Sequence, residues 1–154
     1  MHGLDGLGSL GDMLRIAALV FVAGLAAGCA ANTEKLSTPI ATGLGCVDDS
    51  LRCRNHRRAA LNALMADKKR SWVRQPPNAS AYASGVRLFA FKKRKRELSC
   101  VELGIGQREA KAARPTLRAA AKSLTPGQIA RGAMLGDEVG AELKRERRRR
   151  RCKA

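Results

Sequence analysis

Helix-capping motifs are the feature that most constrains how this chain can fold. Residues 99–102 read S-x-x-E and residues 125–128 read T-x-x-Q, with Pro126 directly after the threonine. In both motifs the two end side chains satisfy amide groups that the first turn of a helix leaves unpaired, and proline is favoured at the first helical position. We therefore predict one helix from the first motif towards Arg114, where Pro115 kinks or restarts it, and a last helix that opens at the second motif.

The segment between residues 46 and 98 is predicted to hold two further helices. A helix is predicted to begin at one of three capping residues, Asp48, Asp49 or Ser50, and to extend to the Q-P-P sequence at 75–77. Apolar residues that follow these caps recur at helical spacing. Asn78 can cap a second helix that carries Tyr82, Val86 and Phe89, although V-R-L-F-A-F also alternates partly like a strand. The fold class is thus predicted to be mostly α, a small domain of about four helices.

The last predicted helix has an apolar stripe that is rich in glycine. Four charged residues within the helix make insertion into a membrane implausible, so the glycines indicate close packing against a neighbouring helix. The stripe comprises Ile129, Gly132, Ala133, Leu135, Gly136, Val139, Gly140 and Leu143.

The N-terminal region carries a short apolar run. Residues 16–31 contain no charge, but sixteen residues fall short of the roughly 20 that a membrane-spanning helix needs, and they suit the core of a secretory signal. Residues 1–12 contain two aspartates and no lysine or arginine, which does not suit the start of an export signal. A start at Met13 would give a more typical leader.

The sequence L-A-A-G-C at residues 25–29 resembles the lipobox of bacterial lipoproteins. The resemblance implies cleavage between Gly28 and Cys29 and a diacylglyceryl group on the Cys29 thiol, with acyl chains such as palmitate. Leucine stands one place earlier than in the commonest form of the motif, where this chain has Ala26. Ala30 after the cysteine implies the outer membrane rather than the inner membrane.

Two alternatives to lipidation stay open. Signal peptidase could cut after Ala30 or Ala31 and release a soluble periplasmic protein, or the apolar run could stay uncut as an anchor. The mature part also resembles small uncharacterised envelope lipoproteins of Gram-negative bacteria, which implies no activity.

These features predict three regions along the chain. Residues 1–28 form the signal peptide, and residues 29–45 form the lipidated N-terminus and a flexible tether that reaches roughly 20 to 25 Å. Residues 46–154 form a small basic helical domain with an arginine-rich C-terminal tail.

Cysteine numbers support export of the chain. Once Cys29 is lipidated or removed, four of the five cysteines remain, and in the oxidising periplasm they are expected to form two disulfides that strengthen an aromatic-poor core. Three connectivities are open, but a helical hairpin about residue 124 would bring Cys100 near Cys152 and leave Cys46 with Cys53. The intervening segments of 6, 46 and 51 residues do not fit the paired spacing of zinc sites, so no metal is expected.

The sequence offers little for catalysis. The mature chain has one histidine, His56, which lies among Arg54, Arg57 and Arg58 without an orienting carboxylate nearby in sequence. Glycine-rich stretches lack the strand-loop-helix context of phosphate-binding loops. We therefore expect neither an enzyme nor a bound cofactor.

The formal charge of +17 points to an anionic partner, because 30 lysines and arginines oppose 13 acidic residues. On an envelope protein we expect contact with lipid headgroups or lipopolysaccharide phosphates, or with another envelope protein. The alternatives are a soluble periplasmic protein-interaction domain and a nucleic-acid-binding protein, which export and the lack of a stacking platform disfavour. The predicted contact residues are Lys92, Lys93, Arg94, Lys95, Arg96, Arg147, Arg148, Arg149, Arg150 and Arg151.

Overall fold

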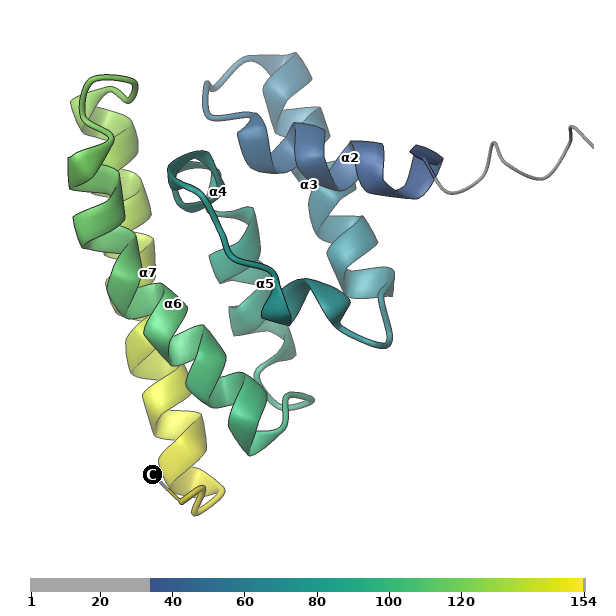
Figure 1. Cartoon of the computed structure of the whole chain (residues 1–154), viewed down its shortest axis with the longest axis vertical. Coiled ribbons are helices and arrows are strands. Elements are labelled where there is room, and N and C mark those ends of the chain that lie inside the picture. Colours follow the sequence, from purple (N-terminus) through teal and green to yellow (C-terminus); the bar gives the residue numbers. More distant parts are fainter. Residues whose placement is uncertain (1–33, 154) are drawn as a thin grey trace, which may run out of the picture. The chain divides into compact units, whose positions relative to one another are not determined.

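The computed structural model describes residues 34–153 and is helical over that range, without a strand (Figure 1). This confirms the predicted fold class and excludes the strand alternative for residues 86–91. The predicted signal peptide and the Gly28–Cys29 cleavage site lie outside the described residues. The elements are α2 (Glu34–Gly45), α3 (Leu51–Ala66), the 3-10 helix η1 (Ser71–Arg74), α4 (Ala79–Ser84), α5 (Val86–Arg94), α6 (Cys100–Ala119) and α7 (Pro126–Arg149).

Helix α2 occupies most of the segment that was predicted to be a flexible tether. The structure describes residues 34–45 as a helix, and the compact unit begins at Leu36, ahead of the expected start near Cys46. The physical reason is local amphipathicity, since Ile40 and Leu44 lie one helical turn apart and both pack against the core. Gly43 allows α2 to approach α3 closely, because an added Cβ would collide with the His56 carbonyl group.

Helix α3 begins as predicted but ends earlier. The Ser50 hydroxyl accepts a hydrogen bond from the Cys53 amide at 3.1 Å, which selects Ser50 among the three candidate caps. The helix ends at Ala66 rather than at the prolines, because the Asp67 carboxylate accepts hydrogen bonds from the amides of Lys69 and Ser71 at 2.9 and 2.7 Å. Aspartate often stabilises a turn in this way, by offering the backbone an alternative to the helix.

The single helix predicted after Asn78 is two helices in the structure. Asn78 caps α4 as predicted, with its side-chain oxygen 2.8 Å from the Ala81 amide nitrogen. Gly85 then adopts φ 72°, a left-handed conformation that ends α4 and that glycine reaches without strain. Helix α5 starts at the next residue.

Both predicted capping boxes are present at the starts of α6 and α7. Helix α6 continues through Pro115 to Ala119 instead of restarting there. The Pro115 side of α6 faces solvent while Ala113 and Leu117 are buried, so water can solvate the carbonyl that the proline leaves without a partner.

Helices α6 and α7 form an antiparallel hairpin and pack along much of their length (Figure 1). The predicted close packing of the α7 glycines is confirmed for Gly132 and Gly136 but not for Gly140. A Cβ at Gly136 would lie 2.9 Å from the Ala110 carbonyl oxygen, and one at Gly132 would lie 2.7 Å from Leu117. Elsewhere in the core Trp72 meets Phe91 edge to face, with the ring centroids 4.8 Å apart.

Candidate anion-binding surface

One disulfide lies at the start of α3 and the other at the C-terminus of the domain. Cys46 pairs with Cys53, and Cys100 pairs with Cys152, at Cα–Cα distances of 5.3 and 5.5 Å. This is the pairing that the predicted hairpin favours. The second bridge joins the start of α6 to the residues that follow α7, so the arginine-rich C-terminus is held against the hairpin.

One cluster of side chains has the composition of a metal site. Ligand atoms of Cys46, Asp48 and Cys53 all lie within 4.8 Å of one another. Both sulfurs are in the disulfide, however, and a metal requires cysteine as the thiolate. In its oxidised form the cluster therefore supplies one exposed carboxylate and no thiolate.

The basic segment 92–96 is mostly engaged within the domain. Lys92 forms ion pairs with Glu138 and Glu142, at 2.5 and 3.3 Å, and Lys95 pairs with Glu142. Hydrogen bonds to these carboxylates raise the pKa of the Lys92 ammonium, and the hydrogen bond from Lys95 lowers the pKa of the Glu142 carboxyl. Both shifts favour the charged forms, so these pairs persist at neutral pH.

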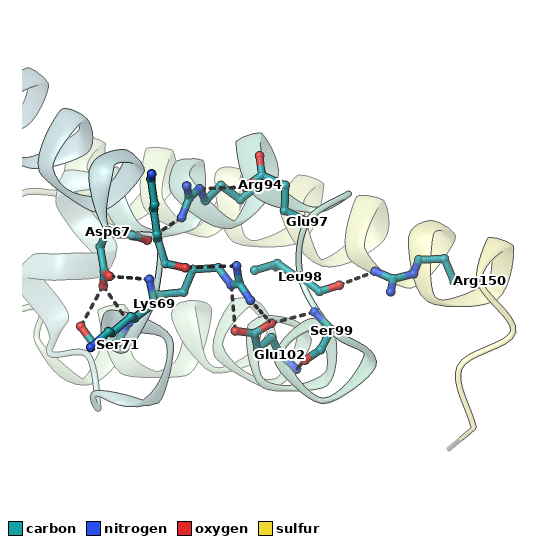
Figure 2. Close-up of polar contacts among 11 residues, drawn as sticks. Asp67, Lys69, Ser71, Arg94, Glu97, Leu98, Ser99, Glu102 and Arg150 are labelled. Carbon is teal, nitrogen blue, oxygen red and sulfur yellow. Dashed lines mark hydrogen bonds and ion pairs between the residues drawn. The ribbon is translucent and has the colours of Figure 1, made fainter.

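Arg94 is buried, and its guanidinium pairs with the exposed Glu97 carboxylate at 3.3 Å. Figure 2 shows the Arg94 guanidinium directed at the Asp67 carbonyl oxygen, with Nη1 donating at 2.7 Å. The same view shows Glu102 accepting a hydrogen bond from the Ser99 amide. Glu102 also accepts a hydrogen bond from Arg70 Nε at 2.9 Å. Of the five predicted contact residues in this segment, only Lys93 and Arg96 are exposed. The other three are buried or half-buried against neighbouring parts of the domain.

Four of the five arginines in the segment 147–151 are exposed, and Arg147 is half-buried. Arg147 donates to the Gln107 side chain at 2.8 Å, and Arg150 donates to the Leu98 carbonyl oxygen, as Figure 2 shows. Arg149 pairs with Glu146 at 2.6 Å. Arg148 and Arg151 are exposed and form no ion pair among the described residues.

The acidic side chains of the domain are nearly all neutralised by neighbours. Between residues 40 and 153, only Asp48 and Asp67 are not in an ion pair with a lysine or arginine. The exposed, unpaired charge over this range is therefore almost entirely positive. Such a surface attracts polyanions.

Exposed cations along α6 and the turn that follows it were not among the predicted contact residues. Arg108, Lys111, Arg118 and Lys122 are exposed and form no ion pair in the described part of the chain. The spacing of Arg108, Lys111 and Arg118 places these three on one face of α6, which is a signal that the sequence carries, and Lys122 lies in the turn after the helix. This signal is less conspicuous than a run of consecutive arginines.

His56 is half-buried on α3. Within residues 34–153, none of the helices is both long enough and apolar enough to cross a bilayer.

The chain matches no protein-family model, and comparisons with curated proteins and with solved structures find no match either.

Proposed function

We propose that this chain is a lipid-anchored protein of the bacterial cell envelope, without enzymatic activity, that contacts anionic headgroups through its exposed cations. The observation that carries the proposal is the charge balance of the domain. Internal ion pairs use nearly all of the carboxylates, and unpaired cations remain exposed on α3, α5, α6, α7 and the C-terminal residues.

The disulfides support the proposed export. Structural disulfides are typical of oxidising compartments such as the periplasm. They pair the other four cysteines with one another, so Cys29 has no cysteine partner within the chain. A lipidated thiol accounts for this odd cysteine.

Acyl labelling tests the anchor. Bacteria that express the full-length chain are grown with radioactive palmitate, beside a Cys29→Ser variant and a Cys46→Ser/Cys53→Ser control that keeps the acceptor. We expect label in the wild type and the control and none in Cys29→Ser. Equal labelling of all three chains, or a mature mass that begins at Ala31 or Asn32, would overturn the proposed anchor.

Vesicle co-flotation tests the anionic contact. The full-length chain is mixed with vesicles of phosphatidylcholine alone or with added phosphatidylglycerol, and the Arg145→Gln/Arg148→Gln variant is compared with Arg52→Gln/Arg54→Gln, which removes two exposed arginines from α3. Because each juxtamembrane cation contributes about 1 kcal/mol, we expect the α7 variant to lose about tenfold or more of its preference for the anionic vesicles. The α3 variant should lose much less.

Two results would count against this contact. One is an equal loss in both variants, which would mean that only the net charge matters. The other is no preference for anionic vesicles together with tight binding to a DNA duplex, which would favour the nucleic-acid alternative.

A further inference from the structure

A groove of about 460 Å³ lies between α6 and α7. Small residues contribute much of its lining: Gly104, Ala110, Gly136, Gly140 and Ala141. The two helices come close at Gly136, whereas a Cβ added at Gly140 would meet only the Ala110 Cβ, at an ordinary 3.5 Å. The missing side chains leave the space that forms the groove.

Cations from both helices line this groove. Arg108 and Lys111 come from α6, and Lys144 and Arg147 come from α7. The Arg108 guanidinium lies over Gly104, since a Cβ added to that glycine would be 3.6 Å from Nη1. Gln107 holds Arg147 by accepting its hydrogen bond at 2.8 Å, which fixes that guanidinium against α6.

Little negative charge opposes these cations. The one carboxylate that lines the groove belongs to Asp137, and it is already paired with Arg114. Among the described residues, no carboxylate forms an ion pair with Arg108, Lys111 or Lys144. The groove therefore concentrates unneutralised positive charge in a concave setting, where a charged ligand loses less of its attraction to solvent screening than on an open surface.

We propose that this groove binds the phosphate groups of a headgroup that carries more than one phosphate. Arginine and lysine are the side chains that most often bind phosphate oxygens, and here two of them stand on each helix. The volume falls in the range of roughly 300 to 1,000 Å³ typical of small-molecule sites and leaves room for a polar body between the phosphates. The inference rests on the proposed function only for the source of the ligand, a phosphorylated glycolipid of the envelope.

Titration with inorganic pyrophosphate tests the site without a membrane. The full-length chain in a neutral detergent is followed by calorimetry and by the amide resonances of Gly104, Gly136 and Gly140. We expect saturable shifts of these amides. Replacement of Lys111 and Lys144 by glutamine should weaken binding by about tenfold or more, since each removes a charge-assisted hydrogen bond.

Two further variants distinguish specific binding in the groove from general attraction to the positive charge of the domain. Arg118→Gln/Lys122→Gln removes the same charge from exposed positions outside the groove and should weaken binding by no more than about threefold. Ala141→Gln keeps every cation but places a neutral side chain at an exposed position that lines the groove. It should weaken pyrophosphate binding while leaving the chain folded.

Unsaturable shifts, shifts that spare the groove glycines, or equal losses in the two charge variants would overturn the inference. Vesicles with a bisphosphorylated glycolipid, compared with phosphatidylglycerol vesicles, test the source, and we expect Lys111→Gln/Lys144→Gln to weaken the first more than the second. Binding to phosphatidylglycerol without pyrophosphate binding would defeat the groove and leave the proposed function standing. Pyrophosphate binding without any vesicle binding would support the groove and contradict the proposed contact with anionic headgroups.

Discussion

Arg87 and Glu109 form a buried ion pair in the middle of the domain. Two guanidinium nitrogens of Arg87 donate to the two carboxylate oxygens of Glu109, at 2.8 and 2.7 Å, and both side chains are almost fully buried. The Arg87 guanidinium also donates to the carbonyl oxygens of Trp72 and Gln75, at 2.7 and 2.8 Å. Because the Arg87 guanidinium has a counterion and carbonyl acceptors, its charge can be buried in the core. There its hydrogen bonds connect α5 with α6 and η1.

Breaking this pair should cost more than breaking an exposed one. Glu109→Leu would leave the Arg87 cation buried without its counterion, and we expect the free energy of unfolding to fall by about 3 to 5 kcal/mol. Glu138→Gln removes one carboxylate that Lys92 contacts at a half-exposed position, and it should cost less than about 1 kcal/mol. Urea denaturation of the two variants checks this, and similar losses would mean that the buried pair has no special role.

Tyr82 should titrate at an unusually high pH. Burial, reinforced by the nearby Glu109 carboxylate, raises the pKa of its phenol from 10.0 to about 12. Since the chain has one tyrosine, absorbance at the phenolate band reports this group alone. We expect a midpoint near 12 in the native protein and near 10.0 in urea.

The same shift predicts a loss of stability at high pH. A raised native pKa means that the native state holds the phenol proton more tightly than the unfolded state does. The stabilising contribution is therefore complete below pH 10 and is lost as the pH rises towards 12. Tyr82→Phe should lack this part of the pH dependence, and equal phenol midpoints in native and unfolded protein would contradict the expectation.

At the scale of elements, the glycines of α7 differ in how much space they have. Gly136→Ala would force the Ala110 carbonyl oxygen to move, so we expect it to destabilise the domain by about 1 to 3 kcal/mol. Gly140→Ala meets ordinary contacts and should stabilise the helix by up to about 1 kcal/mol. Thermal unfolding followed by circular dichroism compares the two variants. A change of the melting temperature in the same direction in both would contradict the difference in packing between Gly136 and Gly140.

The two disulfides should contribute unequally. Cys100 and Cys152 are 52 positions apart in sequence, whereas Cys46 and Cys53 are 7 apart. Because a longer closed loop restricts the unfolded chain more, replacing the long-range pair by serine should cost about 4 kcal/mol and replacing the short-range pair about 2 kcal/mol. Guanidinium denaturation of the two double-serine variants measures the difference, and a greater loss from the short-range pair would contradict the loop argument.

The helices that sequence predicts well are those with local signals. The capping boxes at Ser99 and Thr125 need only contacts three residues apart, so the sequence is sufficient to locate both helix starts. The early end of α3 depends on the hydrogen bonds that the Asp67 carboxylate accepts from the backbone amides of the next turn. The apolar pattern continues past this point, so the pattern does not predict the end of the helix. The Arg87–Glu109 pair spans 22 positions between different helices and has no periodic signal.

The same distinction explains the result for the basic segments. Sequence shows the lysines at 92 and 95 but not the carboxylates that neutralise them, which lie 46 and 47 positions later on α7. The groove between α6 and α7 likewise depends on how two helices pack. A count of charges along the chain therefore predicts an anionic partner without locating the cations that are free to bind it.

At the scale of the whole molecule, the domain neutralises nearly all of its carboxylates internally and leaves unpaired cations exposed on α3, α5, α6, α7 and its C-terminal residues. The attraction that follows from this arrangement is electrostatic, so added salt should weaken it. An interaction through an apolar helix face would not weaken in this way.

Salt titration of vesicle binding tests the central claim most directly. The quantity to measure is the ratio of full-length chain bound to phosphatidylglycerol-containing vesicles over pure phosphatidylcholine vesicles, between about 0.05 and 0.5 M NaCl. The neutral vesicles correct for any binding by the apolar N-terminal run. We expect a ratio well above one at low salt that falls steadily towards one as salt rises, and a ratio of one at low salt, or one that salt leaves unchanged, would contradict the proposed anionic contact.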